Sequence, residues 1–141
     1  ARRSVDHVLK CLRRSGVRRG IVHAFNGSFQ QADEFIRLGF KLGFGGAMTY
    51  DGSTRIRKLA ATLPGESIVL ETDAPDIPPS WLNGRRNTPS ELPRIVQELS
   101  KLRETDIQEV MRSTSNNART ALHFRLAQLA DTLPKATVGG L

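Results

Sequence analysis

Three residues of this sequence have side chains that commonly bind divalent metal ions, and they lie in two apolar segments. His23 interrupts the segment 21–25, and Glu71 and Asp73 close the segment 67–73. Residues two positions apart in a strand project from the same face, so the two carboxylates would repel one another without a cation or a shared proton between them. A histidine and two acids on neighbouring strands therefore form a candidate site for a divalent metal.

Each of these residues also has a purely structural explanation. His23 could be a core histidine whose ring binds backbone groups, and either acid could pair with one of the many arginines. A metal centre usually requires at least three protein ligands. His7 falls on a predicted helix and His123 near the outer face of the last predicted helix, so neither is an obvious third ligand. The sequence pattern leaves both explanations open.

A proline-rich loop follows the acidic pair and contains further candidate residues. Arg85, Arg86 and Asn87 lie near its end, where an arginine could hold a phosphate through two directed hydrogen bonds or simply tie down the loop. Trp81, in the same loop, could stack on a nucleic-acid base or anchor the loop to the rim of the fold.

Hydrophobic spacing and end signals predict the elements that must position these residues. Capping-box patterns mark helix starts at Ser28 with Gln31 and at Thr88 with Glu91. The segment 132–141 is expected to be frayed. Strands are predicted over 21–25, 40–44 and 67–73, and helices over about 5–12, 28–38, 56–63, 92–102, a stretch that starts at the capping pattern 105–108, and about 115–129.

The order of these elements predicts an α/β fold with parallel strands. Strands that are separated by helices cannot form hairpins, so they should lie parallel and be joined by right-handed crossovers. A small open sheet and part of a (β/α)8 barrel both satisfy this pattern. In either architecture the functional residues lie at the C-terminal ends of the strands, where His23, Glu71 and Asp73 are predicted.

The bulk composition indicates one globular domain that favours polyanionic partners. The 141 residues include 21 Lys and Arg against 14 Asp and Glu, a formal net charge of +7, which suits nucleic acid but also serves solubility. Cys11 is the only cysteine, so no intrachain disulfide can form. We found no signal peptide or apolar run long enough to span a bilayer, and we expect a cytoplasmic protein without a membrane partner.

Four local motifs together resemble the TatD-like metal-dependent hydrolases in their order and spacing. The resemblance covers residues 1–124 and leaves 125–141 as the end of the last helix and a tail. It implies that the chain is the C-terminal portion of a (β/α)8 barrel of the TIM type, with about three parallel strands and flanking helices. The motifs are Val22-His23-Ala24-Phe25-Asn26-Gly27, Glu71-Thr72-Asp73-Ala74-Pro75, Arg86-Asn87-Thr88-Pro89 and Asn116-Asn117-Ala118-Arg119.

The resemblance implies a role for each candidate residue. His23 and Asp73 would be ligands of divalent ions, Mg²⁺, Mn²⁺ or Zn²⁺, and Asp73 would also take a proton from the attacking water. Glu71 would be an auxiliary carboxylate of the catalytic site. Arg86 and Asn87 would shape the loop over the site and bind substrate.

The resemblance also implies a function and a gap in the site. Similar proteins hydrolyse phosphodiester bonds, so the expected activity is that of a DNase on a nucleic-acid substrate. The alternatives are an ester hydrolase of the D-aminoacyl-tRNA deacylase type and a basic nucleic-acid-binding module without catalysis. Ala1-Arg2 looks like the family's His-x-Arg strand end without its histidine, and the family's N-terminal His-x-His pair and bridging Glu are not in this sequence. We therefore expect the isolated chain to be weakly active or inactive.

Overall fold

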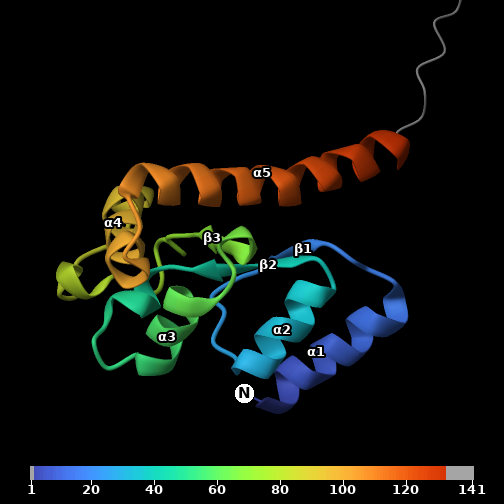
Figure 1. Ribbon diagram of the computed structural model, residues 1–141, viewed down its shortest axis with the longest axis horizontal. Helices are drawn as coiled ribbons and strands as arrows, with labels where there is room; N and C mark the ends of the chain where they lie inside the picture. The colour runs from blue at the N-terminus through green and yellow to red at the C-terminus, as the bar shows by residue number, and fades with distance from the viewer. Residues whose placement is uncertain (1, 133–141) are drawn as a thin grey trace, which may run out of the picture.

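A parallel three-stranded sheet forms the centre of the computed structural model, which describes the backbone of residues 2–132 and the side chains of residues 4–122 (Figure 1). The strands are β1 (Gly20–Val22), β2 (Phe40–Phe44) and β3 (Ile68–Leu70), in the spatial order β1-β2-β3. Both pairings are parallel, with Ile21 opposite Lys41 and Leu42 opposite Ile68. The predicted α/β fold with three parallel strands is confirmed.

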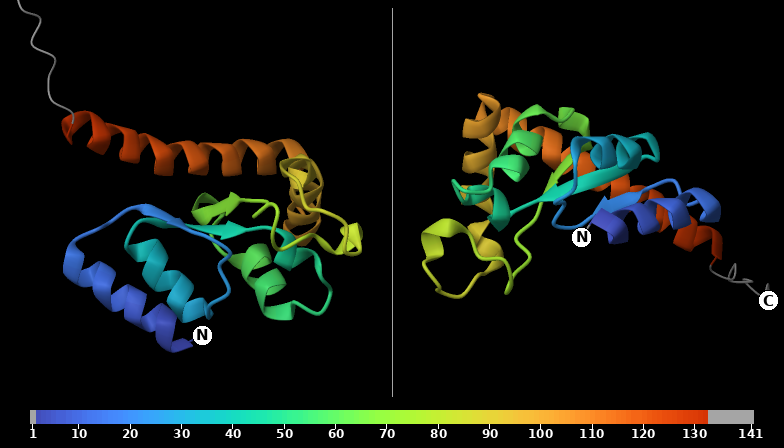
Figure 2. Two further views of the ribbon diagram at one scale, coloured as in Figure 1. Left: turned by 180° about the vertical axis from the view of Figure 1, so that it is seen from behind. Right: turned by 90° about the horizontal axis from the view of Figure 1, so that it is seen from below.

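Helices cover both faces of this sheet. Three of them, α1 (Arg2–Ser15), α2 (Phe29–Arg37) and α3 (Thr54–Thr62), lie on one face, whereas α5 (Ile107–Thr132) runs along the other and contacts all three strands (Figures 1 and 2). α4 (Leu92–Arg103) packs on α3 and α5, and the loop between β3 and α4 projects from the body of the molecule (Figure 2). Within residues 2–132, no helix combines the length and the apolar character needed to cross a membrane.

Aromatic rings fill the core between the sheet and the α2 side. Phe25 lies 6.0 Å from Phe35 and 6.4 Å from Phe44, and Phe35 lies 6.0 Å from Phe40, all measured between ring centroids and all edge to face. Such pairs stabilise the fold by about 0.5–1.5 kcal/mol each beyond the area that they bury. The alternation of β2 places Phe40 and Phe44 on one face and leaves Gly43 on the other, toward the site described below.

The start and the end of α2 follow from its sequence. The hydroxyl of Ser28 accepts the Gln31 N–H at 3.1 Å, and the Gln31 side chain accepts the Ser28 N–H at 3.0 Å, so the predicted capping box is confirmed. Gly39 follows the helix with φ +83, and a Cβ there would lie 2.3 Å from the carbonyl oxygen of Arg18. Glycine is required at this position because both the backbone angle and the space exclude a side chain.

The strands that lead to the site are shorter than predicted. β1 ends at Val22 and β3 at Leu70, so His23 is not inside a strand, and Glu71 and Asp73 lie beyond β3. The chain turns because Ala24 and Asp73 adopt φ of 46° and 52°, outside the range of a strand.

The capping box predicted at Thr88 and Glu91 is wrong. Thr88 makes no side-chain cap, and Oε2 of Glu91 instead accepts the indole N–H of Trp81 at 2.7 Å. A short 3-10 turn, Pro89–Glu91, therefore precedes α4, which begins at Leu92.

The two helices predicted after residue 105 are one continuous helix, α5. Oδ1 of Asp106 accepts the backbone N–H of Gln108 at 2.8 Å and of Glu109 at 3.4 Å, so Asp106 rather than Thr105 caps its start. The hydroxyl of Thr114 donates back to the Val110 carbonyl at 2.8 Å, which lets a polar stretch remain helical. The side chain of His123 and the predicted tail beyond residue 132 lie outside the described residues.

Candidate metal centre

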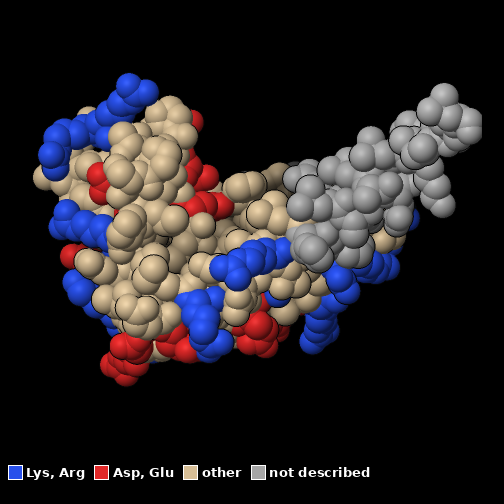
Figure 3. Space-filling view, turned by 90° about the horizontal axis from the view of Figure 1, so that it is seen from above, with Lys and Arg blue, Asp and Glu red and all other residues tan. Residues whose placement is uncertain are grey.

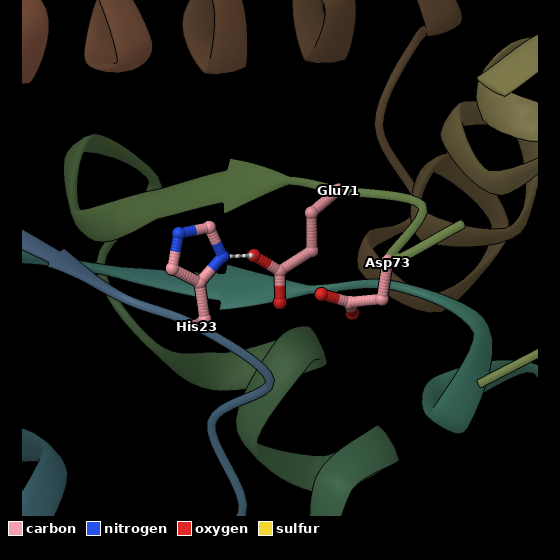
Figure 4. Close-up of side chains that lie close together, drawn as sticks. All are labelled: His23, Glu71 and Asp73. Carbon is pink, nitrogen blue, oxygen red and sulfur yellow. Dashed lines mark hydrogen bonds and ion pairs between the residues drawn. The ribbon is translucent and has the colours of Figure 1, made fainter. Parts of the chain in front are cut away.

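His23, Glu71 and Asp73 converge at the C-terminal ends of β1 and β3 (Figure 4). Each residue offers one ligand atom, and these three atoms lie within 4.8 Å of one another. The structure thus brings together all three residues that the sequence singled out. Glu71 and Asp73 do not share a strand face as predicted, however, because Asp73 follows the strand and reaches the site through its left-handed backbone.

Glu71 spans the middle strand and holds the loop that follows β1. Its Oε2 lies 2.8 Å from Nδ1 of His23, and its Oε1 accepts the backbone N–H of Ala24. The hydrogen bond between Glu71 and His23 needs one proton, which either the carboxyl group or the imidazole Nδ1 can carry. Gly43 of β2 makes this crossing possible, because a Cβ at that position would lie 2.4 Å from Oε2 of Glu71.

Burial dominates the environment of the Glu71 carboxyl group. Its side chain is only 10% exposed, and burial, with the charge of Asp73 as a further contribution, raises the pKa of this carboxyl above its ordinary value. The hydrogen bond from Ala24 and the interactions with His23 act in the opposite direction without cancelling the effect.

His23 is exposed, which excludes its interpretation as a core histidine. Its side chain is 74% exposed, with one ring nitrogen facing Glu71 and the other pointing away from both carboxylates (Figure 4). The alternative explanation for the acids is also wrong within the described part of the chain, because no arginine forms an ion pair with Glu71 or Asp73 there.

Two residues of the site adopt a strained backbone. Ala24 and Asp73 have φ of 46° and 52°, a region that costs a residue other than glycine about 1–2 kcal/mol. Such conformations concentrate at functional sites, where the surrounding structure enforces them. At Ala24, the strained backbone directs the N–H toward Glu71.

Asn87 fixes the loop on which Asp73 lies. Its side chain is 2% exposed, and its amide donates to the carbonyl oxygens of Thr72 at 2.7 Å and Asp76 at 2.6 Å. The Asp76 N–H in turn donates to the Asp73 carbonyl at 2.7 Å. Asn87 therefore lies beneath the loop and sets its shape instead of presenting its amide to solvent, where the predicted contact with substrate would place it.

The other loop residues divide between anchoring and exposure. Arg85 donates to the carbonyl of Leu82 at 3.1 Å and so ties down its own loop. Trp81 is an anchor, since its indole binds Glu91 and the Arg94 guanidinium lies 4.4 Å from its ring centroid. Arg86 is exposed and lines a pocket with Ala74, Pro75 and residues 87–89. Ala74 directly follows Asp73 in the sequence, so the pocket adjoins the site.

Charge is unevenly distributed over the molecular surface. Figure 3 shows a hollow with Asp and Glu side chains on its wall and Lys and Arg side chains on the lobe beside it.

The sequence analysis missed Ala24 and Gly43 as parts of the site. Three glycines in the segment 43–46 were a signal, because glycine in a buried strand often marks the close approach of another group. The Ala24 amide had no such signal, since any residue except proline supplies a backbone N–H.

The donor set fits a divalent metal ion. One imidazole and two carboxylates supply the nitrogen and oxygen ligands that Zn²⁺, Mn²⁺ and Mg²⁺ accept in proteins. Among the side chains that the structure describes, no lysine or arginine forms an ion pair with the two acids, an arrangement that a bound cation would stabilise.

Comparison with known proteins identifies metal-dependent hydrolases as relatives of this chain. The family model for TatD related DNase matches residues 1–123. An uncharacterized metal-dependent hydrolase of Escherichia coli K12, YjjV, is 40% identical over 121 residues, which are 85% of this chain and 47% of YjjV. The 3'-5' ssDNA/RNA exonuclease TatD of Yersinia pseudotuberculosis is 35% identical over 111 residues, or 75% of this chain and 42% of that protein. The chain thus spans about half the length of the curated relatives it matches.

Solved structures show the same fold. The crystal structure of E. coli YjjV superposes with a TM-score of 0.79 over 85% of this chain and 47% of that one, at 40% identity. A TatD family hydrolase from Entamoeba histolytica superposes with a TM-score of 0.72 at 18% identity, over 86% of this chain and 48% of the other. With the family model matched along most of its length, this chain belongs to the TatD related DNase family.

Proposed function

We propose that this chain provides part of the active site of a metal-dependent hydrolase that cleaves phosphodiester bonds in nucleic acid, DNA above all. The convergence of His23, Glu71 and Asp73 at one edge of the sheet is the observation that supports it most directly. The Yersinia relative is named as an exonuclease of single-stranded DNA and RNA, which favours the same substrate class.

His23 and Asp73 would hold the divalent ion, Mg²⁺, Mn²⁺ or Zn²⁺, with Glu71 as the auxiliary carboxylate between them. The ion would supply Lewis-acid stabilisation of the charge on the phosphoryl oxygens. Nδ1 of His23 would be the ligand atom of the ring, because the other ring nitrogen points away from both carboxylates.

Asp73 and Arg86 act on water and substrate in this proposal. Asp73 accepts the proton of the attacking water, since its carboxylate is the one with no hydrogen bond to His23 or Ala24. The exposed guanidinium of Arg86 binds a phosphate of the substrate, as a fork of N–H donors suits that group. Asn87 acts indirectly by holding the Asp73 loop.

Metal binding by the chain itself is the first test. Calorimetric titration with Mn²⁺ should show binding that Asp73→Asn and His23→Ala each weaken at least about tenfold, whereas the exposed Asp51→Asn leaves it unchanged. Equal binding by wild type and Asp73→Asn would contradict the assignment of Asp73 as a metal ligand.

Hydrolysis is best tested in a protein of full family length, because the chain spans about half of its relatives. Replacing the matched segment of the Yersinia exonuclease with this chain should give a hydrolase of single-stranded DNA that chelation or Asp73→Asn inactivates. The same hybrid assayed on charged tRNA separates phosphodiester from ester hydrolysis. Activity that persists in Asp73→Asn contradicts the proposal.

A further inference from the structure

An exposed aromatic ring lies beside a cation at the edge of the molecule that bears the metal centre. Phe29 is the first residue of α2 and is 40% exposed. The ammonium of Lys58, on α3, lies 5.9 Å from the centroid of the Phe29 ring. α2 and α3 each follow a strand of the parallel sheet, so both helices begin at the strand ends where His23 and Asp73 lie.

Arg55 extends this cluster toward the metal centre. It is exposed, near the start of α3, and its guanidinium donates to Oδ1 of Asn26 at 2.8 Å. Asn26 lies three residues after His23 on the loop that leads to α2. The Arg55 side chain is therefore fixed beside the same loop that Glu71 holds at its other end.

The position of Arg55 is unfavourable for the helix alone. The first turn of α3 contains no acidic residue, and a cation near a helix N-terminus opposes the helix dipole. Together with an exposed ring and the ammonium of Lys58, it gives an aromatic surface flanked by two positive charges.

We propose that Phe29, Arg55 and Lys58, here called the rim cluster, bind a single strand of nucleic acid. An unpaired base stacks on the Phe29 ring, and the neighbouring phosphates contact the two cations. The ligand is single-stranded because the faces of paired bases are covered by their neighbours in a duplex. This inference rests on the proposed function for its ligand class and adds a second contact region, separate from Arg86, that leads the strand toward His23.

The test measures how tightly the full chain binds a labelled oligothymidine of about a dozen nucleotides. Fluorescence anisotropy reports the binding, and a chelator is present throughout. Chelation prevents hydrolysis, so binding is measured alone. Phe29→Ala should weaken binding about fivefold or more, while Phe29→Trp retains it because the ring persists. Arg55→Ala with Lys58→Ala should lower the slope of log K against log salt by about 1.4, or about 0.7 for each of two phosphates.

Two exposed residues outside the rim cluster supply matched controls. Lys101→Ala removes the same charge as Lys58→Ala from the last turn of α4, and Met111→Ala removes an exposed apolar side chain from α5. Circular dichroism of each variant checks that the fold is retained. If the chain does not bind the oligonucleotide, if the rim variants match the controls, or if a duplex of the same length binds equally well, the inference is wrong.

The outcomes also separate this inference from the proposed function. Binding that depends on the rim cluster, combined with no hydrolysis by the hybrid protein with any metal, would reject the hydrolase and leave the rim cluster as a binding surface. Hydrolysis that requires Asp73, combined with rim variants that bind like wild type, would support the hydrolase and reject the rim cluster as a binding surface.

Discussion

At the scale of single residues, Gly43 controls whether Glu71 can reach across β2. No other residue leaves this space, since a Cβ there would lie 2.4 Å from the Glu71 carboxylate. The end of a flexible side chain can move away at low cost, whereas Gly45 faces the Glu71 backbone oxygen, at 2.5 Å from its would-be Cβ. Gly43 is therefore needed for the geometry of the site, whereas Gly45 is needed for the stability of the fold.

Gly43→Ala should lower Mn²⁺ affinity about 10- to 100-fold, because it displaces the carboxylate that orients His23. The free energy of unfolding should change little. Gly45→Ala should instead destabilise the chain by about 1–3 kcal/mol. Gly52→Ala is the matched control, since nothing lies within 4 Å of a Cβ there. Metal titration and urea unfolding measure the two effects, and an unchanged affinity in Gly43→Ala would contradict the role given to Glu71.

Glu71 also makes stability depend on pH. Because burial and the charge of Asp73 raise its pKa in the folded chain above 4.5, the folded state binds this proton more tightly than the unfolded state. This contribution to stability is complete below about pH 4.5 and is lost as the pH rises through the raised pKa. Glu71→Gln should therefore gain stability relative to wild type as pH increases. Urea midpoints from about pH 4 to pH 7, with a chelator present, test this, and a constant difference between the two proteins would refute it.

At the scale of elements, two buried asparagines hold the segments at the two ends of β3. Asn87 binds the loop beyond its C-terminal end through the carbonyls of Thr72 and Asp76. Asn117 of α5 donates to the carbonyls of Gly65 and Ile68, both at 2.8 Å, at its N-terminal end. A buried side-chain amide that donates to two carbonyl groups thus holds the loop of the site at one end of β3 and the packing of α5 at the other.

Asn87→Ala and Asn117→Ala should each lower the free energy of unfolding by about 1–3 kcal/mol, because each leaves two carbonyl groups without their amide partner. Only Asn87→Ala should also weaken metal binding, since it releases the loop of Asp73. The exposed Asn116→Ala is the control. Equal metal affinity in both variants would mean that the loop does not depend on Asn87.

Local signals predicted the elements well where the partners are close in sequence. The Ser28 and Gln31 capping box formed as predicted because both residues lie in one helical turn. The same pattern failed at Glu91, whose carboxylate binds the indole of Trp81 ten residues away, a partner that no local pattern shows. The sequence predicted two helices where α5 is continuous, because a polar stretch separates their apolar positions. In the structure, Thr114 and Asn117 of that stretch donate hydrogen bonds to carbonyl groups.

The membership of the site was predictable, but its geometry was not. Residue type and order identified His23, Glu71 and Asp73, and all three converge. The left-handed backbone at Ala24 and Asp73 could not be foreseen, because neither is a glycine and tertiary contacts enforce both angles.

At the scale of the whole molecule, metal binding and folding are linked. An ion that binds only the folded chain stabilises it by about 2.7 kcal/mol at a concentration of 100 times the dissociation constant. Mn²⁺ should therefore raise the thermal midpoint of the wild type, and His23→Ala and Asp73→Asn should abolish that rise. Asp51→Asn should behave like wild type. A midpoint that Mn²⁺ does not move would show that this chain alone does not bind the ion.

The bond between His23 and Glu71 joins residues 48 positions apart and crosses over β2. Contacts of such long range form only after the intervening chain has ordered, since the entropy of closing the loop opposes them. During refolding, the ability to bind metal should consequently appear together with the completed sheet, after the local helices. A metal-sensitive probe would then report the last step of assembly rather than its beginning.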